Sequence, residues 1–190
     1  MRNIISFMHI SLDGFVCGPN GEMNWIKVDD EIFDHVEKRI MKTDTALYGR
    51  VTYEMMQSYW PTAADQPNAS NHDKNHSKWY SKAHKIVLSN RLKDKQFENT
   101  TILSENFIAD LKAIKETEGS EILVFGSPST THALIHAGMI DGYWLFINPI
   151  LLGSGIPLFS NGSSQKLLQR ISTHEFKNGV TELNYEVKTS

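Results

Sequence analysis

The chain has one cysteine, Cys17, among its 190 residues, so no disulfide can form within it. Disulfides stabilise many proteins of oxidising compartments, and their absence favours a reducing one. No apolar run approaches the roughly 20 residues that a membrane-spanning helix needs. Residues 1–4 lead directly into a strand-like segment, so no secretory signal is expected. Together these absences predict a cytoplasmic protein.

A large charge excess is also lacking. Lysine and arginine number 19 against 22 aspartates and glutamates, which gives a net charge of −3. Binders of nucleic acid or of anionic membranes usually carry a basic surface, so neither partner is expected. The hydrophobic fraction of 40% and charged fraction of 22% are those of an ordinary globular protein. This length and composition predict a single domain over residues 1–190.

Short apolar, β-rich segments alternate with segments of helical periodicity along most of the chain. This alternation predicts an α/β fold with a mostly parallel central sheet, flanked by helices. The tail alternates with a period of two and predicts an antiparallel hairpin. Residues 17–25 are expected to form a loop, and residues 61–75 a polar stretch. Strands are expected at 3–12, 45–48, 85–89, 100–103, 121–125, 142–150, 165–176 and 180–188, and helices at 29–42, 51–58, 107–116 and 129–136.

Three of the predicted strands end in residues suited to binding an anion. Neither Gly-x-Gly-x-x-Gly nor a P-loop motif is present. Instead, strand 45–48 runs through Gly49 and Arg50 into a helix, whose first N–H groups have no partner of their own. Strand 121–125 is followed by glycine, hydroxyl residues and Pro128, which suits a first helical position. Residues 85–88 are followed by Ser89-Asn90-Arg91, a set able to hold an adenosine 2′-phosphate. Each is open to a plainer interpretation as a surface turn or a serine N-cap.

Four segments in order resemble the dihydrofolate reductase fold family: residues 10–15 (ISLDGF), 47–54 (LYGRVTYE), 125–129 (FGSPS) and 148–159 (NPILLGSGIPLF). Within that family, the chain is most similar to stand-alone relatives of the reductase domain of the bifunctional riboflavin-biosynthesis deaminase/reductase. The resemblance implies NADPH as cofactor, hydride transfer to a small heterocyclic substrate, and a homodimer. The substrate of the related domain is 5-amino-6-(5-phosphoribosylamino)uracil.

The resemblance also assigns cofactor contacts by position. The phosphates or adenosine ribose would lie on Gly49, Arg50 and Thr52, the adenine end on Leu88, Ser89 and Asn90, and the pyrophosphate on Gly126, Ser127, Ser129 and Thr130. Arg50 or Arg91 would pair with the 2′-phosphate. Pro128 departs from the Gly-Gly turn of dihydrofolate reductases and lacks an N–H donor.

The reacting end is assigned more sparsely. Asp13 and Asp30 are the candidate catalytic carboxylates, and Trp25 with the loop Gly153-Ser154-Gly155 the candidate substrate contacts. Asp13 also suits the acceptor of an Asp-Gly turn. Asp30 equally suits an acidic first helical turn. Two interpretations of the glycine loop stay open: it could close over the substrate, or it could simply link two strands.

Metal chemistry is not expected. His72 and His76 have the i,i+4 spacing of a helical zinc site, but a solvated polar segment is the preferred interpretation. Likewise, a structural role is the default for His132 and His136. Three functions stay open: a riboflavin-reductase-like enzyme, a true dihydrofolate reductase in which Asp30 is a buried pterin partner, and a nucleotide-binding module without catalysis.

Overall fold

An eight-stranded sheet in the order β5-β4-β3-β6-β1-β7-β10-β9 runs through the computed structural model, which describes residues 1–159 and 165–188. The first six strands of this order are mutually parallel, whereas β10 and β9 are antiparallel to their neighbours. The predicted fold class, including the terminal hairpin, is therefore confirmed. The strands are β1 (Ile4–Ser11), β2 (Phe15–Cys17), β3 (Thr45–Gly49), β4 (His84–Leu88), β5 (Thr100–Leu103), β6 (Ile122–Val124), β7 (Gly142–Asn148), β8 (Ile156–Pro157), β9 (Leu168–Glu175) and β10 (Thr181–Val187).

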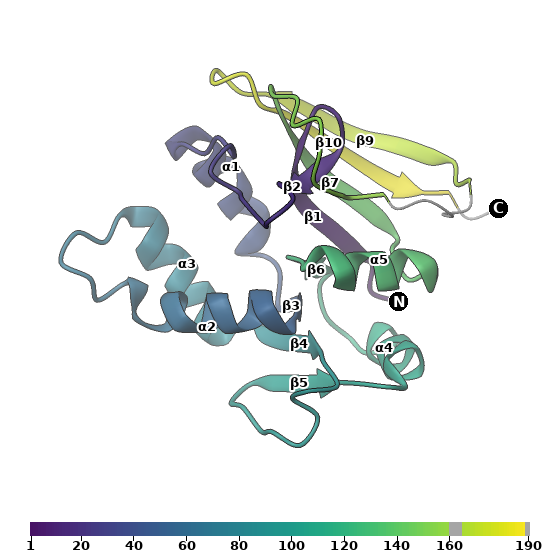
Figure 1. Ribbon diagram of the computed structural model, residues 1–190. Coiled ribbons are helices and arrows are strands. Elements are labelled where there is room, and N and C mark those ends of the chain that lie inside the picture. Colours follow the sequence, from purple (N-terminus) through teal and green to yellow (C-terminus); the bar gives the residue numbers. More distant parts are fainter. Residues whose placement is uncertain (160–164, 189–190) are drawn as a thin grey trace.

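Helices cover both faces of this sheet (Figure 1). They are α1 (Asp30–Ile40), α2 (Arg50–Ala63), α3 (Asn71–Lys82), α4 (Phe107–Lys115) and α5 (Pro128–His136). Successive side chains of a strand point to opposite faces, so β7 supplies Trp144 to one core and Leu145 to the other. The core with Trp144 contains apolar residues of α1, α2 and α3. The core with Leu145 contains those of α4 and α5.

Strand β1 lies near the centre of the sheet and extends beyond the end of one of its two neighbours, β6. Its pairing with β6 ends at Ser6, opposite Val124. Its pairing with β7 continues to Ser11, opposite Asn148. The second half of β1 is therefore unpaired on the side of β6. In open α/β sheets, ligands bind at such strand ends, where the connections leave in opposite directions.

Helices reach into both ends of the polar stretch 61–75, and neither was predicted there from the sequence. Helix α2 extends to Ala63, with Pro61 inside it, and α3 begins at Asn71. A capping box starts α3, because the hydroxyl of Ser70 accepts from the amide of Asp73 and the Asp73 carboxylate accepts from the amide of Ser70. Although α3 is mostly polar, its buried face packs against α1 and α2, and this packing stabilises the helix.

A second, two-stranded sheet was not expected from the sequence. It pairs β2 antiparallel to β8 and so joins the segment after β1 to the segment after β7. The close approach requires Gly155, because a Cβ there would collide with the carbonyl oxygen of Cys17. Among the described residues, no helix combines the length and hydropathy needed to cross a membrane.

Replacing Leu111 by alanine should destabilise the fold. Leu111 of α4 is fully buried, and its loss should lower the free energy of unfolding by about 2–5 kcal/mol. Ile108 of the same helix is 39% exposed, so Ile108→Ala should cost about 0.5 kcal/mol or less. Urea denaturation of both variants measures the difference. Equal losses would contradict the described packing of α4.

Candidate functional site

Two helices begin side by side at the carboxyl ends of β3 and β6. These strands are neighbours in the sheet, and the amide of Gly49 donates to the carbonyl of Gly126 at 2.7 Å. Gly49 is the N-cap of α2 and Ser127 that of α5, and neither helix start has a side-chain cap. The free N–H groups and the positive dipole ends of both helices therefore meet in one place, which favours an anion.

Glycine is needed at both strand ends, for different reasons. A Cβ on Gly49 would lie 2.6 Å from the hydroxyl of Ser127, and closer still to that of Thr130. Gly126 has a φ of +103°, which side chains rarely adopt. Thr52, on the first turn of α2, has its hydroxyl 3.7 Å from the position of a Cβ on Gly126. The two helix starts therefore pack so closely that a side chain at Gly49 would collide with α5.

A cluster of hydroxyls lines the start of α5. The hydroxyl of Ser127 lies 2.9 Å from that of Ser129 and 3.3 Å from that of Thr130. Hydroxyl groups donate to phosphate oxygens as readily as to one another, so this cluster suits a pyrophosphate. Together with Gly49, Thr52 and Gly126, these residues form what we call the cradle. The structure brings all six together from two separate segments of the sequence.

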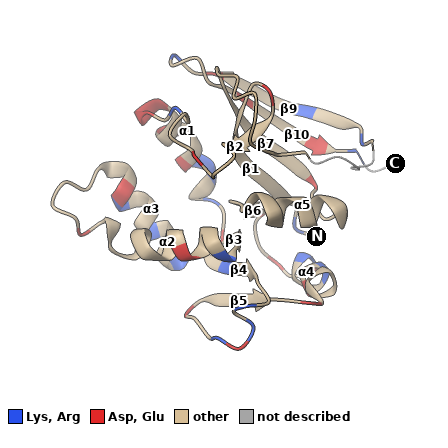
Figure 2. Ribbon diagram, in the orientation of Figure 1, with Lys and Arg blue, Asp and Glu red and all other residues tan. Residues whose placement is uncertain are grey.

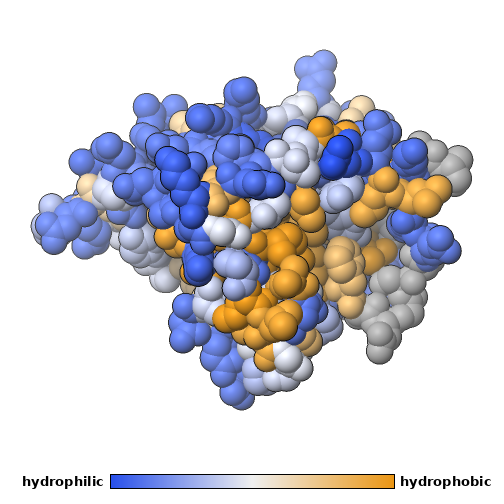
Figure 3. Space-filling model, turned by 90° about the horizontal axis from the view of Figure 1, so that it is seen from above, coloured by the Kyte–Doolittle hydropathy of each residue, from blue (hydrophilic) through white to orange (hydrophobic). Residues whose placement is uncertain are grey.

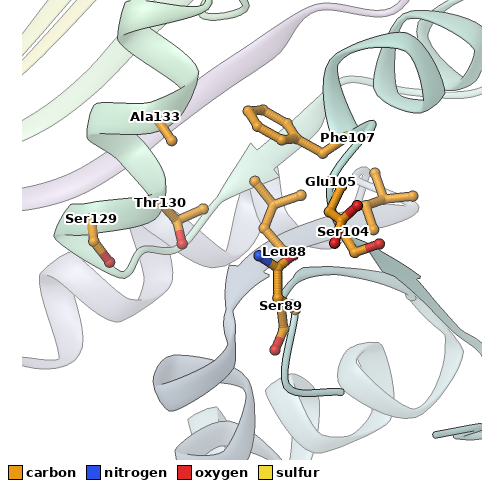
Figure 4. Close-up of a pocket in the computed structure, with 10 residues that line it drawn as sticks. Leu88, Ser89, Ser104, Glu105, Phe107, Ser129, Thr130 and Ala133 are labelled. Atoms are coloured by element: carbon orange, nitrogen blue, oxygen red, sulfur yellow. The ribbon is translucent and has the colours of Figure 1, made fainter. Parts of the chain in front are cut away.

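A groove of about 310 Å³ leads from the cradle across the ends of β4 and β5. In Figure 4, Ser129 and Thr130 of α5 stand on one side, with Ser104, Glu105 and Phe107 on the other and Leu88 between them. Its lining residues are Leu88, Ser89, Asn90, Leu103, Ser104, Glu105, Phe107, Ser129, Thr130 and Ala133. Apolar side chains with polar groups beside them suit an adenosine. Leu88, Ser89 and Asn90, to which the sequence analysis assigned the adenine end, line this groove.

The two arginines expected near this groove differ in their surroundings. Arg50 forms an ion pair with Glu54 one turn along α2, at 2.6 Å. The side chain of Arg91 is exposed and has no ion-pair partner within the described part of the chain. Its backbone amide donates to the hydroxyl of Ser89 at 3.2 Å. Figure 2 shows charges of both signs spread over the elements, so these arginines are local features and not part of a basic face.

At the end of β1, Asp13 holds another loop in place. One carboxylate oxygen accepts from the hydroxyl of Ser11 at 2.7 Å and from the amide of Leu152 at 3.1 Å. The other accepts from the amide of Gly153 at 2.7 Å. The hydrogen bond from Ser11, with those from Gly153 and Leu152, lowers the pKa of Asp13 below its ordinary value of 3.8. The geometry therefore makes Asp13 the anchor of the loop that carries Gly153, Ser154 and Gly155.

The other two residues expected at the reacting end lie further along the chain. Trp25 is partly buried, and its indole N–H donates to the carbonyl of Glu22 at 3.0 Å. Asp30 is exposed on the first turn of α1, next to Asp29, which caps the helix by accepting from the amide of Ile32. An exposed Asp30 does not fit the buried pterin partner that a true dihydrofolate reductase requires.

Residues 2–181 match the RibD C-terminal domain family. The chain belongs to this family. It is 29% identical to the uncharacterised protein YyaP of Bacillus subtilis over 97% of this chain and 94% of that protein. Among solved structures, a candidate riboflavin biosynthesis protein of Shewanella sp. PV-4 has a TM-score of 0.72 at 22% identity, covering 99% of this chain and 100% of the other. A dihydrofolate reductase of Enterococcus faecalis, solved with NADP(H), has a TM-score of 0.64 at 14% identity, covering 98% and 97%. The resemblance drawn from four sequence segments is confirmed.

The histidines of α3 in this RibD C-terminal domain family member pack against aromatic rings, with His76 buried and His72 half-buried. His76 is buried with its ring centroid 3.9 Å from that of Trp60, and His72 stacks on Phe33 of α1 at 4.0 Å. The expectation of a solvated segment is wrong, because both imidazoles act as flat packing surfaces between α1, α2 and α3. Burial lowers the pKa of His76 to about 3. Within residues 1–159 and 165–188, no three His, Cys, Asp or Glu side chains group as metal ligands. His132 contacts the carbonyl of Pro157 at 2.8 Å.

Part of the groove was missed from the sequence. Ser104, Glu105 and Phe107 directly follow β5, and Ala133 lies one turn into α5. The signal was available for the first three, because the end of a parallel strand next to β4 must lie at the same edge of the sheet. Ala133 carries no chemical signal of its own.

The anchoring by Asp13 predicts a pH-dependent loop. Because the folded pKa of Asp13 is lowered, its stabilising effect on the loop is present above pH 3.8 and lost as the pH falls through the folded value. The amide proton shifts of Leu152 and Gly153 should therefore titrate with a midpoint below 3.8. In Asp13→Asn this titration should vanish. A midpoint at or above 3.8 in the unmodified protein would contradict the anchoring.

Proposed function

We propose that this chain is a single-domain, NADPH-dependent reductase of the cytoplasm that transfers hydride to a small heterocyclic substrate. The observation that carries this proposal is the cradle, where two helix N-termini, two glycines and four hydroxyls converge at neighbouring strand ends. The groove beside it supports the proposal, because a dinucleotide needs room for an adenosine next to its pyrophosphate. Membership of the RibD C-terminal domain family supports it independently.

The residues present fit this cofactor. A Cβ on Gly49 would fill the cradle, and the hydroxyls of Ser127 and Thr130 border the same space. We assign the pyrophosphate to the cradle and the adenosine to the groove, with its 2′-phosphate toward Arg50 or Arg91. When bound, NADPH supplies the hydride. The chain's own residues then have to hold the nicotinamide near β1 and exclude water from it.

The reacting end is proposed for the loops that follow β1 and β7. In Figure 3, which views the molecule from the top of Figure 1, hydrophobic side chains gather across the middle of the face that carries these loops. Leu12 and Leu151 are 66% and 70% exposed and belong to these segments. Apolar surface of this kind suits a planar nicotinamide and a planar substrate. Asp13, Trp25, Asp30 and the loop 153–155 lie in or beside these segments, with Asp13 as a positioning residue.

The proposed substrate is 5-amino-6-(5-phosphoribosylamino)uracil or a similar heterocycle, as the family resemblance implies. A true dihydrofolate reductase is less well supported, since Asp30 is exposed and α3 packs directly against α1. Oxidation of NADPH should be followed with the uracil derivative and with dihydrofolate as acceptors. Binding of NADPH without oxidation by any acceptor would favour a nucleotide-binding module.

Cofactor preference tests the assignment of the arginines. A charge-assisted contact with the 2′-phosphate contributes about 1.5–3 kcal/mol, so NADPH should bind roughly ten- to a hundredfold more tightly than NADH. Arg50→Ala or Arg91→Ala should narrow this ratio and leave NADH binding nearly unchanged. Lys112→Ala, which removes an exposed positive charge from α4, is the matched control. Titration by nicotinamide fluorescence measures all four proteins. Equal affinity of the unmodified protein for both cofactors would overturn the assignment.

The homodimer is proposed to form through β9. This strand ends the sheet, all eight of its residues are exposed, and Leu168 and Ile171 are 40% and 49% exposed. An unpaired edge with apolar side chains is a template for association. Ile171→Lys should convert a dimer into a monomer in sedimentation equilibrium, whereas Ile108→Lys on α4 should not. A dimer that persists in Ile171→Lys would place the interface elsewhere.

A further inference from the structure

His9 is a titratable side chain that no feature of the cofactor site explains. It lies on β1 beyond the last residue paired with β6, so its strand is unpaired on the side of the cradle. The cradle is close by: the methyl carbon of Met8, the preceding residue, lies 3.4 Å from the position that a Cβ would take on Gly126. His9 is only partly exposed and points to the opposite face of the sheet from Met8.

The orientation of a neighbouring amide fixes how His9 is protonated. Asn148 is fully buried, and its side-chain oxygen accepts from the backbone amide of Lys27 at 2.8 Å. Its nitrogen faces the carbonyls of Phe146 and Ile10 at 3.2 and 3.4 Å. An amide N–H only donates and a carbonyl only accepts, so these partners settle which end of the Asn148 amide is which.

The same nitrogen of Asn148 lies 3.4 Å from Nδ1 of His9. Asn148 presents an N–H group there, so we assign Nδ1 as the acceptor and the proton of the neutral imidazole to Nε2. Burial lowers the pKa of His9 to about 4, so the ring is neutral at neutral pH. Nε2 makes no hydrogen bond within residues 1–159 and 165–188, which leaves one oriented N–H donor uncommitted.

Aromatic rings hold this donor in a fixed direction. The His9 ring is stacked on Phe146 with centroids 5.0 Å apart and meets Phe7 edge-on at 6.3 Å. Phe7 in turn contacts Phe125, the residue before Gly126 of the cradle, at 5.3 Å. The donor is therefore preorganised on a rigid aromatic floor next to the proposed nicotinamide site, which is the arrangement that favours binding of a flat, polar-edged ligand.

We propose that His9 binds the substrate, donating a hydrogen bond from Nε2 to a ring carbonyl oxygen of a planar heterocycle. This inference rests on the proposed function and names the group that recognises the substrate of that reaction. It assigns His9 to binding: a neutral donor orients the substrate and polarises its carbonyl, while the proton count of the reaction is unaffected.

The test compares His9→Phe with the unmodified protein, because phenylalanine keeps the stacked ring and lacks the donor. The probe is 5-amino-6-(5-phosphoribosylamino)uracil, titrated into protein saturated with NADP⁺ so that no turnover occurs. His9→Phe should weaken binding of the probe about tenfold, as expected for one lost hydrogen bond to a carbonyl, with binding of NADPH within about twofold of normal. His9→Gln, which restores a donor, should recover part of the loss. His174→Phe on exposed β9 is the matched control and should change neither affinity.

Several outcomes would overturn the inference. Normal affinity of His9→Phe for the probe would remove His9 from the substrate site. If His9→Phe lost affinity for NADPH and for the probe equally, the effect would be structural and the inference would fail. If the unmodified protein bound NADPH but not the probe, the proposed class of substrate would be wrong. Absence of NADPH binding in the unmodified protein would instead overturn the proposed function. Nitrogen-15 spectra of the imidazole provide a readout independent of any ligand: a protonated Nδ1 at neutral pH would contradict the assigned tautomer.

Discussion

The close packing of the starts of α2 and α5 is the constraint on which the rest of the site depends. The amide of Gly49 donates to the carbonyl of Gly126, and a Cβ on Gly49 would overlap two hydroxyls of α5. Without this approach, the two helix N-termini would point at separate regions of solvent. With it, their unpaired N–H groups and dipoles add at one point, which favours a bound anion. Two glycines therefore bring backbone N–H groups from two helices to one site.

The unequal lengths of β6 and β7 divide this site from the reacting end. Because β6 stops opposite Ser6 while β7 continues to Ser11, the end of β1 is flanked on one side by strand and on the other by the cradle. Side chains of this half-free segment, His9 among them, lie at the carboxyl end of β1 beside the cradle. The antiparallel pair β2 and β8, with Asp13 bound to the amides of Leu152 and Gly153, closes the far side.

Helix α3 fills one side of the sheet with ring side chains. Its buried face presents His76, Trp79 and Tyr80, and His72 stacks against Phe33 of α1. Rings occupy the space between α1 and α2 on this face of the sheet. Asp30 lies exposed on the first turn of α1.

Chain order alone determined the architecture and which candidate cofactor residues lie together, because the carboxyl ends of strands in a parallel sheet meet at one edge whatever their spacing in the sequence. Leu88, Ser89, Ser127 and Thr130 were identifiable for that reason. Tertiary structure decided the rest. The sequence of α3 is polar, and only the tertiary structure shows that its imidazole rings pack against α1 and α2. Asn148 reaches His9, and Asp13 reaches Leu152, each across 139 residues. Contacts of that range leave no local pattern, since neither residue constrains the sequence beside the other.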